Sequence, residues 1–263
     1  MKLTSLFISS ALLFSVAFAR PSRFAQRVAA REARRSRPNI PSTNGAARAS
    51  NISNVEFSEN WSGAVITSPP AGQTFTTVVG TFTVPTPASG TTGGASAWVG
   101  IDGDTAQQSI LQSGVDFTVS GGRSTFDAWF EWFPLDSTDF EGFEVSPGNV
   151  ITVSVHATST TTGTVVLENV STGKSVTENV QAPDSAAALK GQNAEWIVED
   201  FEEGDSLVPF ANFGTVVFSG ATASTASETL TPVGATVFEI EQGSDILTSV
   251  SISSSGEITV THT

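Results

Sequence analysis

The sequence predicts an all-β fold, a sandwich of two stacked antiparallel sheets. Short runs rich in Val, Thr, Phe and Ile recur along residues 51–263, and Gly, Pro, Ser and Asn separate these runs. No amphipathic helix of ordinary length interrupts the pattern. A stretch of about 210 residues suffices for one large all-β domain, so residues 51–263 are predicted to form a single domain.

Thirteen segments carry the strand pattern, because each is enriched in the β-branched and aromatic residues that fit a pleated, half-buried surface. In chain order they span residues 62–67, 73–84, 96–101, 108–119, 123–133, 149–157, 163–170, 174–180, 194–201, 215–219, 235–240, 246–252 and 257–262. One segment differs. In DSAAALKG, residues 184–191, Asp184 suits a helix N-cap and Gly191 a helix end, which predicts one or two helical turns.

Two of the predicted strands carry carboxylates among aromatic residues on one face, because alternate residues of a strand share a face. In one strand this face holds Asp127, Trp129, Glu131 and Phe133, opposite Ala128, Phe130 and Trp132. In the other it holds Glu195, Ile197, Glu199 and Phe201, opposite Trp196, Val198 and Asp200. A carboxylate taken out of water is costly unless it is paired, protonated or used. Each face is therefore either a solvated outer surface or part of a substrate groove.

The N-terminal residues have the layout of an export signal. Residues 1–19 run from Lys2 through a short apolar stretch to Ala17, Phe18 and Ala19, which predicts a signal peptide cleaved after Ala19. No later segment reaches the roughly 18 apolar residues that span a bilayer. We therefore expect a secreted, extracellular product with no membrane partner after cleavage.

The charge of the chain is divided between its two parts. Residues 1–50 hold nine basic and one acidic side chain, a net +8, whereas residues 51–263 hold three basic and 25 acidic, a net −22; together they give −14. So acidic a body repels phosphate, and no nucleic-acid partner is expected. We interpret residues 20–50 as a basic propeptide that docks on its own acidic domain and is released in acid. An exposed linker is the alternative.

Metal, cofactor and triad chemistry lack the residues they need. The chain has no cysteine, and its two histidines, His156 and His262, stand apart from any metal-binding or Ser-His-Asp pattern. Phosphate and dinucleotide motifs are absent too, so no metal or other cofactor is expected. Carboxylates and amides remain. They permit glycosidic hydrolysis between two carboxyl groups, or peptide hydrolysis by a carboxylate that activates water beside an oxyanion donor.

Four longer motifs stand out in the sequence. They are ENWSGAV at 59–65, AWVGIDGDTAQQSILQSG at 97–114, FDAWFEWFP at 126–134 and AEWIVEDFEE at 194–203. In this order they resemble the signature segments of the glutamic peptidases, or eqolisins, a family of secreted acid endopeptidases. The resemblance implies two bent antiparallel sheets of the concanavalin or lectin kind, a zymogen, and protein or peptide substrates. The mature domain, residues 51–263, is expected to be a monomer.

The resemblance also implies a catalytic pair of one glutamate and one glutamine. The family's glutamate precedes Asp-Phe and falls on Glu199 rather than Glu195, and its glutamine falls on Gln112. Glu199 is then the general base for water, and the neutral Gln112 amide holds this water and donates to the oxyanion. The positions that line or support the family's cleft fall on Asp102, Trp98, Asp127, Trp129, Glu131, Phe133 and Phe201.

The sequence departs from the family pattern in two ways. It has no cysteine, although relatives often carry disulfides, and it has no tyrosine. Phe130 and Phe133 therefore lack the hydroxyls of the family's AWYEWYP motif. Phe130 is predicted to lie in the core, whereas a missing hydroxyl at Phe133 would bear on activity or specificity.

Three asparagines, Asn51, Asn60 and Asn169, precede x-Ser and are potential glycosylation sites. Asn60 lies in a motif where burial would prevent modification, which leaves Asn169 as the better candidate.

Two other functions are compatible with the residues alone. A carbohydrate-active sandwich enzyme needs a second catalytic carboxyl group near Glu199, for which Glu131 is the candidate. A lectin-like binding module needs only an exposed Trp129 among acidic side chains. Self-shortening of the purified precursor in acid distinguishes a peptidase from both.

Overall fold

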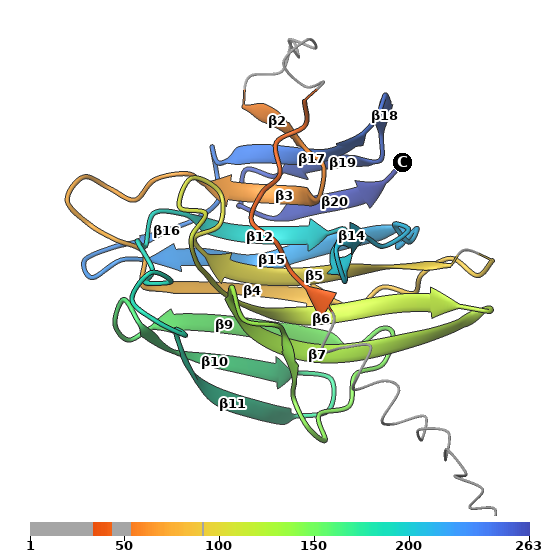
Figure 1. The fold of residues 1–263 in the computed structure, drawn as a ribbon, viewed down its shortest axis with the longest axis horizontal. Coiled ribbons are helices and arrows are strands. Elements are labelled where there is room, and N and C mark those ends of the chain that lie inside the picture. Colours follow the sequence, from red (N-terminus) through yellow and green to blue (C-terminus); the bar gives the residue numbers. More distant parts are fainter. Residues whose placement is uncertain (1–33, 44–53, 91) are drawn as a thin grey trace, which may run out of the picture.

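The computed structural model describes residues 34–43, 54–90 and 92–263, and its regular elements are all strands (Figure 1). Two large sheets stack face to face, which confirms the predicted sandwich. Each of the thirteen predicted segments contains a strand. In this part of the chain, no helix is long and apolar enough to cross a membrane. The predicted signal peptide, most of residues 20–50 and Asn51 lie outside the described residues.

The first large sheet has nine strands. Its order is β18 (Asp245–Ile246), β17 (Thr236–Gln242), β3 (Trp61–Ile66), β12 (Ala194–Glu199), β5 (Gly93–Ile101), β6 (Ile110–Ser120), β7 (Arg123–Phe133) and β8 (Thr138–Asp139), with β2 (Val55–Ser58) parallel to β17. The strand β12 thus lies between β3 and β5, although β3 is more than 120 residues earlier in the chain.

The second large sheet has eight strands. Its order is β11 (Lys174–Gln181), β10 (Thr162–Asn169), β9 (Val150–Ala157), β4 (Thr77–Thr83), β15 (Thr215–Ser224), β20 (Ile258–His262) and β19 (Thr248–Ile252), with β16 (Thr229–Leu230) paired to β15. A small third sheet joins β1 (Arg34–Arg35), β13 (Glu202–Glu203) and β14 (Ser206–Leu207).

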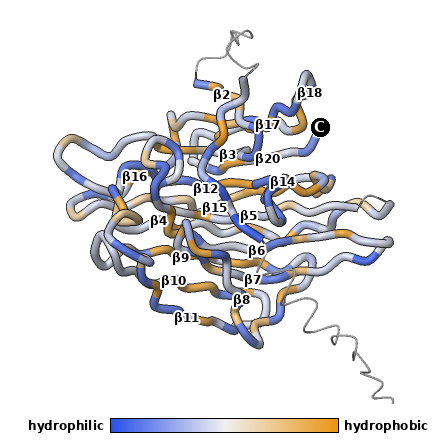
Figure 2. Tube along the Cα trace, viewed as in Figure 1, coloured by the Kyte–Doolittle hydropathy of each residue, from blue (hydrophilic) through white to orange (hydrophobic). Residues whose placement is uncertain are grey.

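The nine-stranded sheet carries a buried apolar cluster on each of its faces. On one face Trp196, Val198 and Val115 belong to the main core, together with residues of the second sheet such as Val153 and Phe218. On its other face a smaller cluster gathers Trp61, Trp98, Trp129, Ile110, Ile197, Val65 and Phe238. Because these outer-face side chains are buried, another segment of the chain must cover this face of the sheet. In the second sheet, by contrast, buried and more exposed residues alternate along β9 and β10, and the hydropathy colour varies along these strands in Figure 2.

The hairpin of β6 and β7 carries several predicted site residues. Its turn is Gly121-Gly122, with φ of 58° and 76°, between the paired residues Ser120 and Arg123. Two consecutive residues with positive φ form the turn that matches the twist of a hairpin, and glycine adopts this conformation without strain. The turn fixes the register that sets Gln112 opposite Glu131.

The predicted helical turns at residues 184–191 are wrong, because these residues form turns without a helix. Asp184 does cap the start, since its carboxylate accepts the N–H of Ala186 at 2.7 Å and of Ala187 at 3.2 Å. The N–H groups of Lys190 and Gly191 then turn to the carboxylate of Asp102. These donors are therefore not available for a helical ladder.

Candidate active site

Three neighbouring rows of the nine-stranded sheet carry the predicted site residues. The first row is Glu199, Ser96, Asp116 and Asp127. The second is Ile197, Trp98, Gly114 and Trp129, and the third is Glu195, Gly100, Gln112 and Glu131. Residues that pair directly, and residues two apart along a strand, share a face. Gln112 and Glu199 therefore lie on the same face, the one turned away from the main core.

Glu199 is fully buried and accepts hydrogen bonds from several directions. One carboxyl oxygen accepts the indole N–H of Trp98 at 2.8 Å and the hydroxyl of Ser36, and the other accepts the N–H of Arg37 at 2.8 Å. The amide of Asn60 lies 3.4 Å from the second oxygen. Burial nevertheless raises the pKa of Glu199 to about 8, because the loss of water disfavours the charged form more than these donors favour it.

Residues 34–42, hereafter the strap, cover this face of the sheet. In Figure 1 they begin in front of β6, at β1, and run across β5 and β12 towards β2. The Asn60 amide reaches the carbonyls of Arg37 and Pro38, and the Trp61 indole donates to the carbonyl of Arg37 at 2.8 Å. Further along, Ile40 donates its N–H to the side-chain oxygen of Asn60. The strap therefore shields part of the outer face of the nine-stranded sheet, including Glu199 and Trp61, from solvent.

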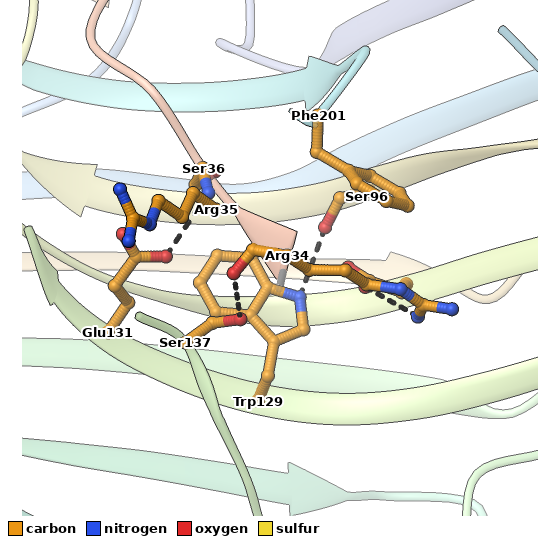
Figure 3. A pocket seen from close by; sticks show the side chains of 9 residues that line it. Arg34, Arg35, Ser36, Ser96, Trp129, Glu131, Ser137 and Phe201 are labelled. Carbon is orange, nitrogen blue, oxygen red and sulfur yellow. Dashed lines mark hydrogen bonds and ion pairs between the residues drawn. The ribbon is translucent and has the colours of Figure 1, made fainter. Parts of the chain in front are cut away.

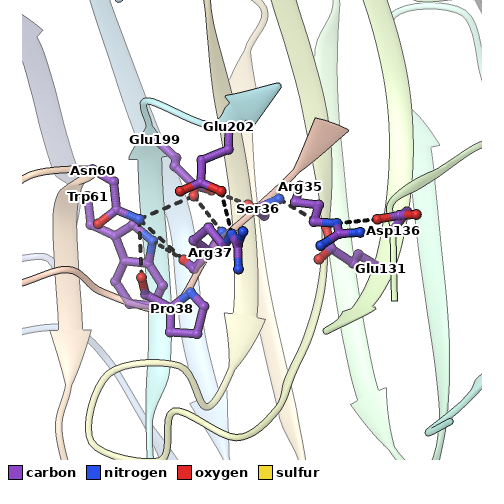
Figure 4. A network of polar contacts seen from close by, with 10 residues as sticks. All are labelled: Arg35, Ser36, Arg37, Pro38, Asn60, Trp61, Glu131, Asp136, Glu199 and Glu202. Atoms are coloured by element: carbon purple, nitrogen blue, oxygen red, sulfur yellow. Dashed lines mark hydrogen bonds and ion pairs between the residues drawn. The ribbon is translucent and has the colours of Figure 1, made fainter. Parts of the chain in front are cut away.

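The basic side chains of the strap pair with acidic side chains of the domain. Arg37 lies 2.6 Å from Glu202, and Arg35 contacts Asp136 (Figure 4). Arg34 lies 3.4 Å from Asp116 and 3.9 Å from Asp127, and its guanidinium is 5.5 Å from the ring centre of Phe201. The arginines of the basic N-terminal segment that lie in the strap thus form ion pairs with carboxylates of the acidic domain.

A small pocket remains beside the strap, and the strap forms one of its walls. Arg34, Arg35 and Ser36 line it together with Trp129, Glu131 and Phe201 (Figure 3). Three of the predicted site residues therefore share one cavity. The indole N–H of Trp129 donates to the hydroxyl of Ser96 at 3.1 Å, which holds the ring against the sheet.

Ser36 links the row of Glu199 with the row of Gln112. Its hydroxyl contacts Glu199, and its backbone N–H donates to Glu131 at 3.3 Å. Glu131 is the direct cross-strand neighbour of Gln112. One residue of the strap thus spans the space between the two predicted catalytic positions.

Gln112 is fully buried, and neither its amide nitrogen nor its amide oxygen has a hydrogen-bond partner among the described residues. A carboxamide offers two donors and an acceptor with two lone pairs, all of which normally find partners when buried. The strap therefore engages Glu199 but not Gln112.

Asp102 has a supporting position rather than one in the cleft. Its carboxylate accepts the N–H groups of four consecutive residues, 190–193, at 2.6–3.3 Å, while its own φ is 70°. Burial raises the pKa of Asp102, and these four hydrogen bonds oppose the rise. Asp102 thereby holds the segment that leads into β12, the strand of Glu199.

The two phenylalanines that replace family tyrosines lie on opposite faces. Phe133 packs against the cluster of Trp98 and Trp129, whereas Phe130 packs on the main core beside Phe140, with ring centres 5.0 Å apart. The prediction that Phe130 is a core residue is confirmed, and the lost hydroxyl nearest the site is that of Phe133.

Sequence reasoning missed several residues of this site. Ser36 and Arg37 contact Glu199 directly, and Asn60 and Trp61 hold the strap, yet none of the four was predicted to have a role there. The motif that contains Asn60 and Trp61 was a usable signal. Nothing in the local pattern around Ser36 distinguishes it from the other small residues of the basic segment.

Both described glycosylation candidates are buried. The Asn60 side chain is engaged with the strap, as expected of a buried motif. Asn169, which the sequence favoured, is also fully buried, and its amide donates to the side chain of Asn149 at 2.9 Å. Neither side chain is accessible for modification in the folded chain.

Comparison with known proteins agrees with this geometry. The fold and the buried glutamate site on its outer face define the chain as a peptidase of the glutamic type, and the model of the Peptidase A4 family matches residues 59–262. The chain belongs to this family. It is 44% identical to aspergillopepsin-2 of Aspergillus niger over 229 residues, which cover 80% of this chain and 79% of the relative. It is 37% identical to scytalidopepsin B of Scytalidium lignicola, with 96% of each chain covered.

Solved structures lead to the same conclusion. A scytalido-glutamic peptidase bound to a transition-state-analogue inhibitor superposes with a TM-score of 0.71 at 36% identity, over 78% of this chain and 98% of that one. Aspergilloglutamic peptidase of Aspergillus niger gives a TM-score of 0.62 at 48% identity, over 65% and 99%. The protein is therefore an acid endopeptidase that hydrolyses protein or peptide substrates. This result sets aside the carbohydrate-active and lectin-like alternatives.

Proposed function

We propose that Glu199 and Gln112 form the catalytic pair of this peptidase, and that the chain is an inactive precursor whose strap blocks the pair. The observation that carries the proposal is the place of the peptide bond between Ser36 and Arg37. Its N–H donates to Glu199 at 2.8 Å. A nitrogen in this position is where the leaving group of a cleaved peptide must receive its proton.

The chemistry follows from the two side chains. With a substrate in place of the strap, the Glu199 carboxylate takes a proton from water, whose oxygen attacks the peptide carbonyl carbon. The Gln112 amide donates to the oxyanion that develops, and because an amide does not titrate it keeps this role in acid. The carbon–nitrogen bond then breaks, and the protonated Glu199 returns its proton to the leaving amine.

The two side chains must act across a gap. Their rows are four residues apart, which is about 13 Å along an ideal strand. The substrate and the attacking water have to occupy this space. The contacts of Ser36 with Glu199 and with Glu131, the neighbour of Gln112, support a peptide that lies between the two rows.

The strap inhibits in two ways under this proposal. It fills the cleft, and its hydroxyl at Ser36 takes a hydrogen-bonding place on Glu199 that the attacking water needs. It also excludes solvent, and burial raises the pKa of Glu199 to about 8, so the side chain holds its proton in acid and is no base. When the strap leaves, water returns to the site and the pKa falls towards the acid range.

The rest of the precursor plan is part of the same proposal. Residues 1–19 direct secretion, residues 20–50 are the propeptide that contains the strap, and residues 51–263 are the mature domain, a monomer that works outside the cell. The support is the export-signal pattern, the division of charge, and the pairing of strap arginines with Glu202, Asp136 and Asp116.

Cleavage of a protein substrate in acid by matured wild type, Glu199→Gln and Gln112→Ala tests the pair. We expect losses of roughly 10²–10⁴ for the base and roughly 10²–10³ for the oxyanion donor. The matched controls are Glu202→Gln, three residues away, and Gln108→Ala, on an exposed position ahead of β6. Full activity of folded Glu199→Gln would remove the assignment.

A further inference from the structure

Glu195 is a buried acid that the proposed mechanism does not use. It lies on β12 in the row of Gln112, is fully buried, and neither of its carboxyl oxygens has a hydrogen-bond partner among the described residues. Burial, with the nearby charges of Asp102 and Asp104, raises its pKa well above the usual value. Burial therefore favours the neutral carboxylic acid, which has one O–H to donate.

The residue of β5 that lies between Glu195 and Gln112 is a glycine. Gly100 on β5 pairs with both residues, one on each side. A Cβ atom built on Gly100 would lie 3.0 Å from a carboxyl oxygen of Glu195 and 3.2 Å from the Cβ of Gln112, with the Trp98 ring at 3.0 Å. The carboxyl group of Glu195 and the Cβ atom of Gln112 thus lie beside the same glycine, and a larger residue at this position would crowd both.

Their hydrogen-bonding needs are complementary. Glu195 has a donor with no acceptor, and the Gln112 carboxamide has an acceptor with no donor. Buried polar groups normally find partners, and these two unpartnered groups belong to residues that flank the same glycine, Gly100. We propose that protonated Glu195 donates a hydrogen bond to the carboxamide oxygen of Gln112, so that the NH₂ group of Gln112 points into the cleft.

The inferred contact makes Glu195 a positioning residue, and it rests on the proposed role of Gln112. Because an amide can present either its oxygen or its nitrogen to the cleft, a catalytic glutamine needs a partner that selects one orientation. A donor at Glu195 selects the orientation in which Gln112 donates to the oxyanion. The second lone pair of the Gln112 carboxamide oxygen stays available for the attacking water.

The test compares Glu195→Gln with Glu195→Met in the matured enzyme. Glutamine keeps a neutral donor at this position, whereas methionine has similar length and no donor. We expect Glu195→Gln to keep kcat within about threefold, and Glu195→Met to lower kcat about ten- to a hundredfold with KM unchanged, as for other small misplacements of a catalytic group. In a Gln112→Ala background, Glu195→Met should cause no further loss of kcat.

Three results would overturn the inference: equal losses in the two variants, unchanged kcat in folded Glu195→Met, or the same loss when Gln112 is already absent. If Glu195→Met does not fold, a crystal structure of the matured wild type decides. A carboxyl oxygen of Glu195 within 3.2 Å of the Gln112 amide oxygen supports the inference, and a larger separation rejects it. Wild-type activity of Gln112→Ala would instead reject the proposed pair, so the two failures are distinguishable.

Discussion

The backbone N–H of Arg37 donates a hydrogen bond of 2.8 Å to the buried carboxyl group of Glu199. A segment near the N-terminus therefore presents a peptide bond to the buried acid of a peptidase cleft. The hydroxyl of Ser36 and the indole N–H of Trp98 donate to the other carboxyl oxygen of Glu199. The strap thus covers the carboxyl group of Glu199, and under the proposed function it occupies the place of a substrate.

The hydroxyl of Ser36 should contribute to inhibition. A peptide with the sequence of residues 34–42 is expected to inhibit the matured enzyme, and Ser36→Ala in this peptide should weaken inhibition by roughly ten- to a hundredfold, because a hydrogen bond to a buried carboxyl group is lost. Inhibition constants in acid measure the effect. Ser42→Ala, whose hydroxyl contacts Glu241 at the far end of the strap, is the matched control. Equal effects of the two changes would contradict the prediction.

Charge reversal at Arg37 should loosen the strap. In the precursor, Arg37→Glu replaces the contact of 2.6 Å with Glu202 by repulsion. The pair is partly exposed, and pairs of this kind contribute about 0.2–1 kcal/mol, so we expect a modest gain of up to about fivefold in precursor activity. The measurement is peptide cleavage before maturation. Lys174→Glu, a reversal on the distant strand β11, should leave latency unchanged.

The buried acids Glu199 and Asp200 should contribute most to the stability of the folded precursor in acid. Burial raises the pKa of Glu199 to about 8 and of Asp200 to about 7, above the unfolded values of 4.5 and 3.8. Below the unfolded values both states hold these protons, and stability is complete. As pH rises, the unfolded chain releases them first, so the free energy of unfolding falls until the folded pKa values are passed.

Urea unfolding between pH 4 and pH 8 measures this trend. The slope contributed by one such group is at most about 1.4 kcal/mol per pH unit. Glu199→Gln should reduce the slope, because the neutral amide has no proton to lose. A free energy of unfolding that rises from pH 5 to pH 8 would contradict the burial of these acids.

Asp102 should be important for stability and only indirectly for catalysis. Asp102→Ala leaves four backbone N–H groups without their acceptor, two of them buried, and places alanine at a φ of 70°, so we expect a loss of about 2–4 kcal/mol. Asp102→Asn keeps one oxygen and tolerates this φ, and it should lose less. Urea unfolding ranks the variants, with Asp245→Ala on an exposed position as the control.

The strands were predictable because their information is local. A period of two assigns Glu195, Ile197, Glu199 and Phe201 to one face whatever the neighbours of the strand are. The helical turns at residues 184–191 were predicted from the capping residues Asp184 and Gly191 alone. They do not form, because the N–H groups of Lys190 and Gly191 donate to Asp102, more than 80 residues away, and not to carbonyls of a helix.

The sequence by itself determined the all-β class, the faces of the strands and the division of charge, since each depends only on the order of residues along the chain. The motif resemblance added Gln112 and Glu199. Only the tertiary structure decided which strands are neighbours, and therefore that Ser36 contacts Glu199 and that Glu195 and Gln112 flank Gly100. The physical reason is that burial, and with it the protonation of these acids, depends on the segments that cover them, and no local pattern specifies such long-range contacts.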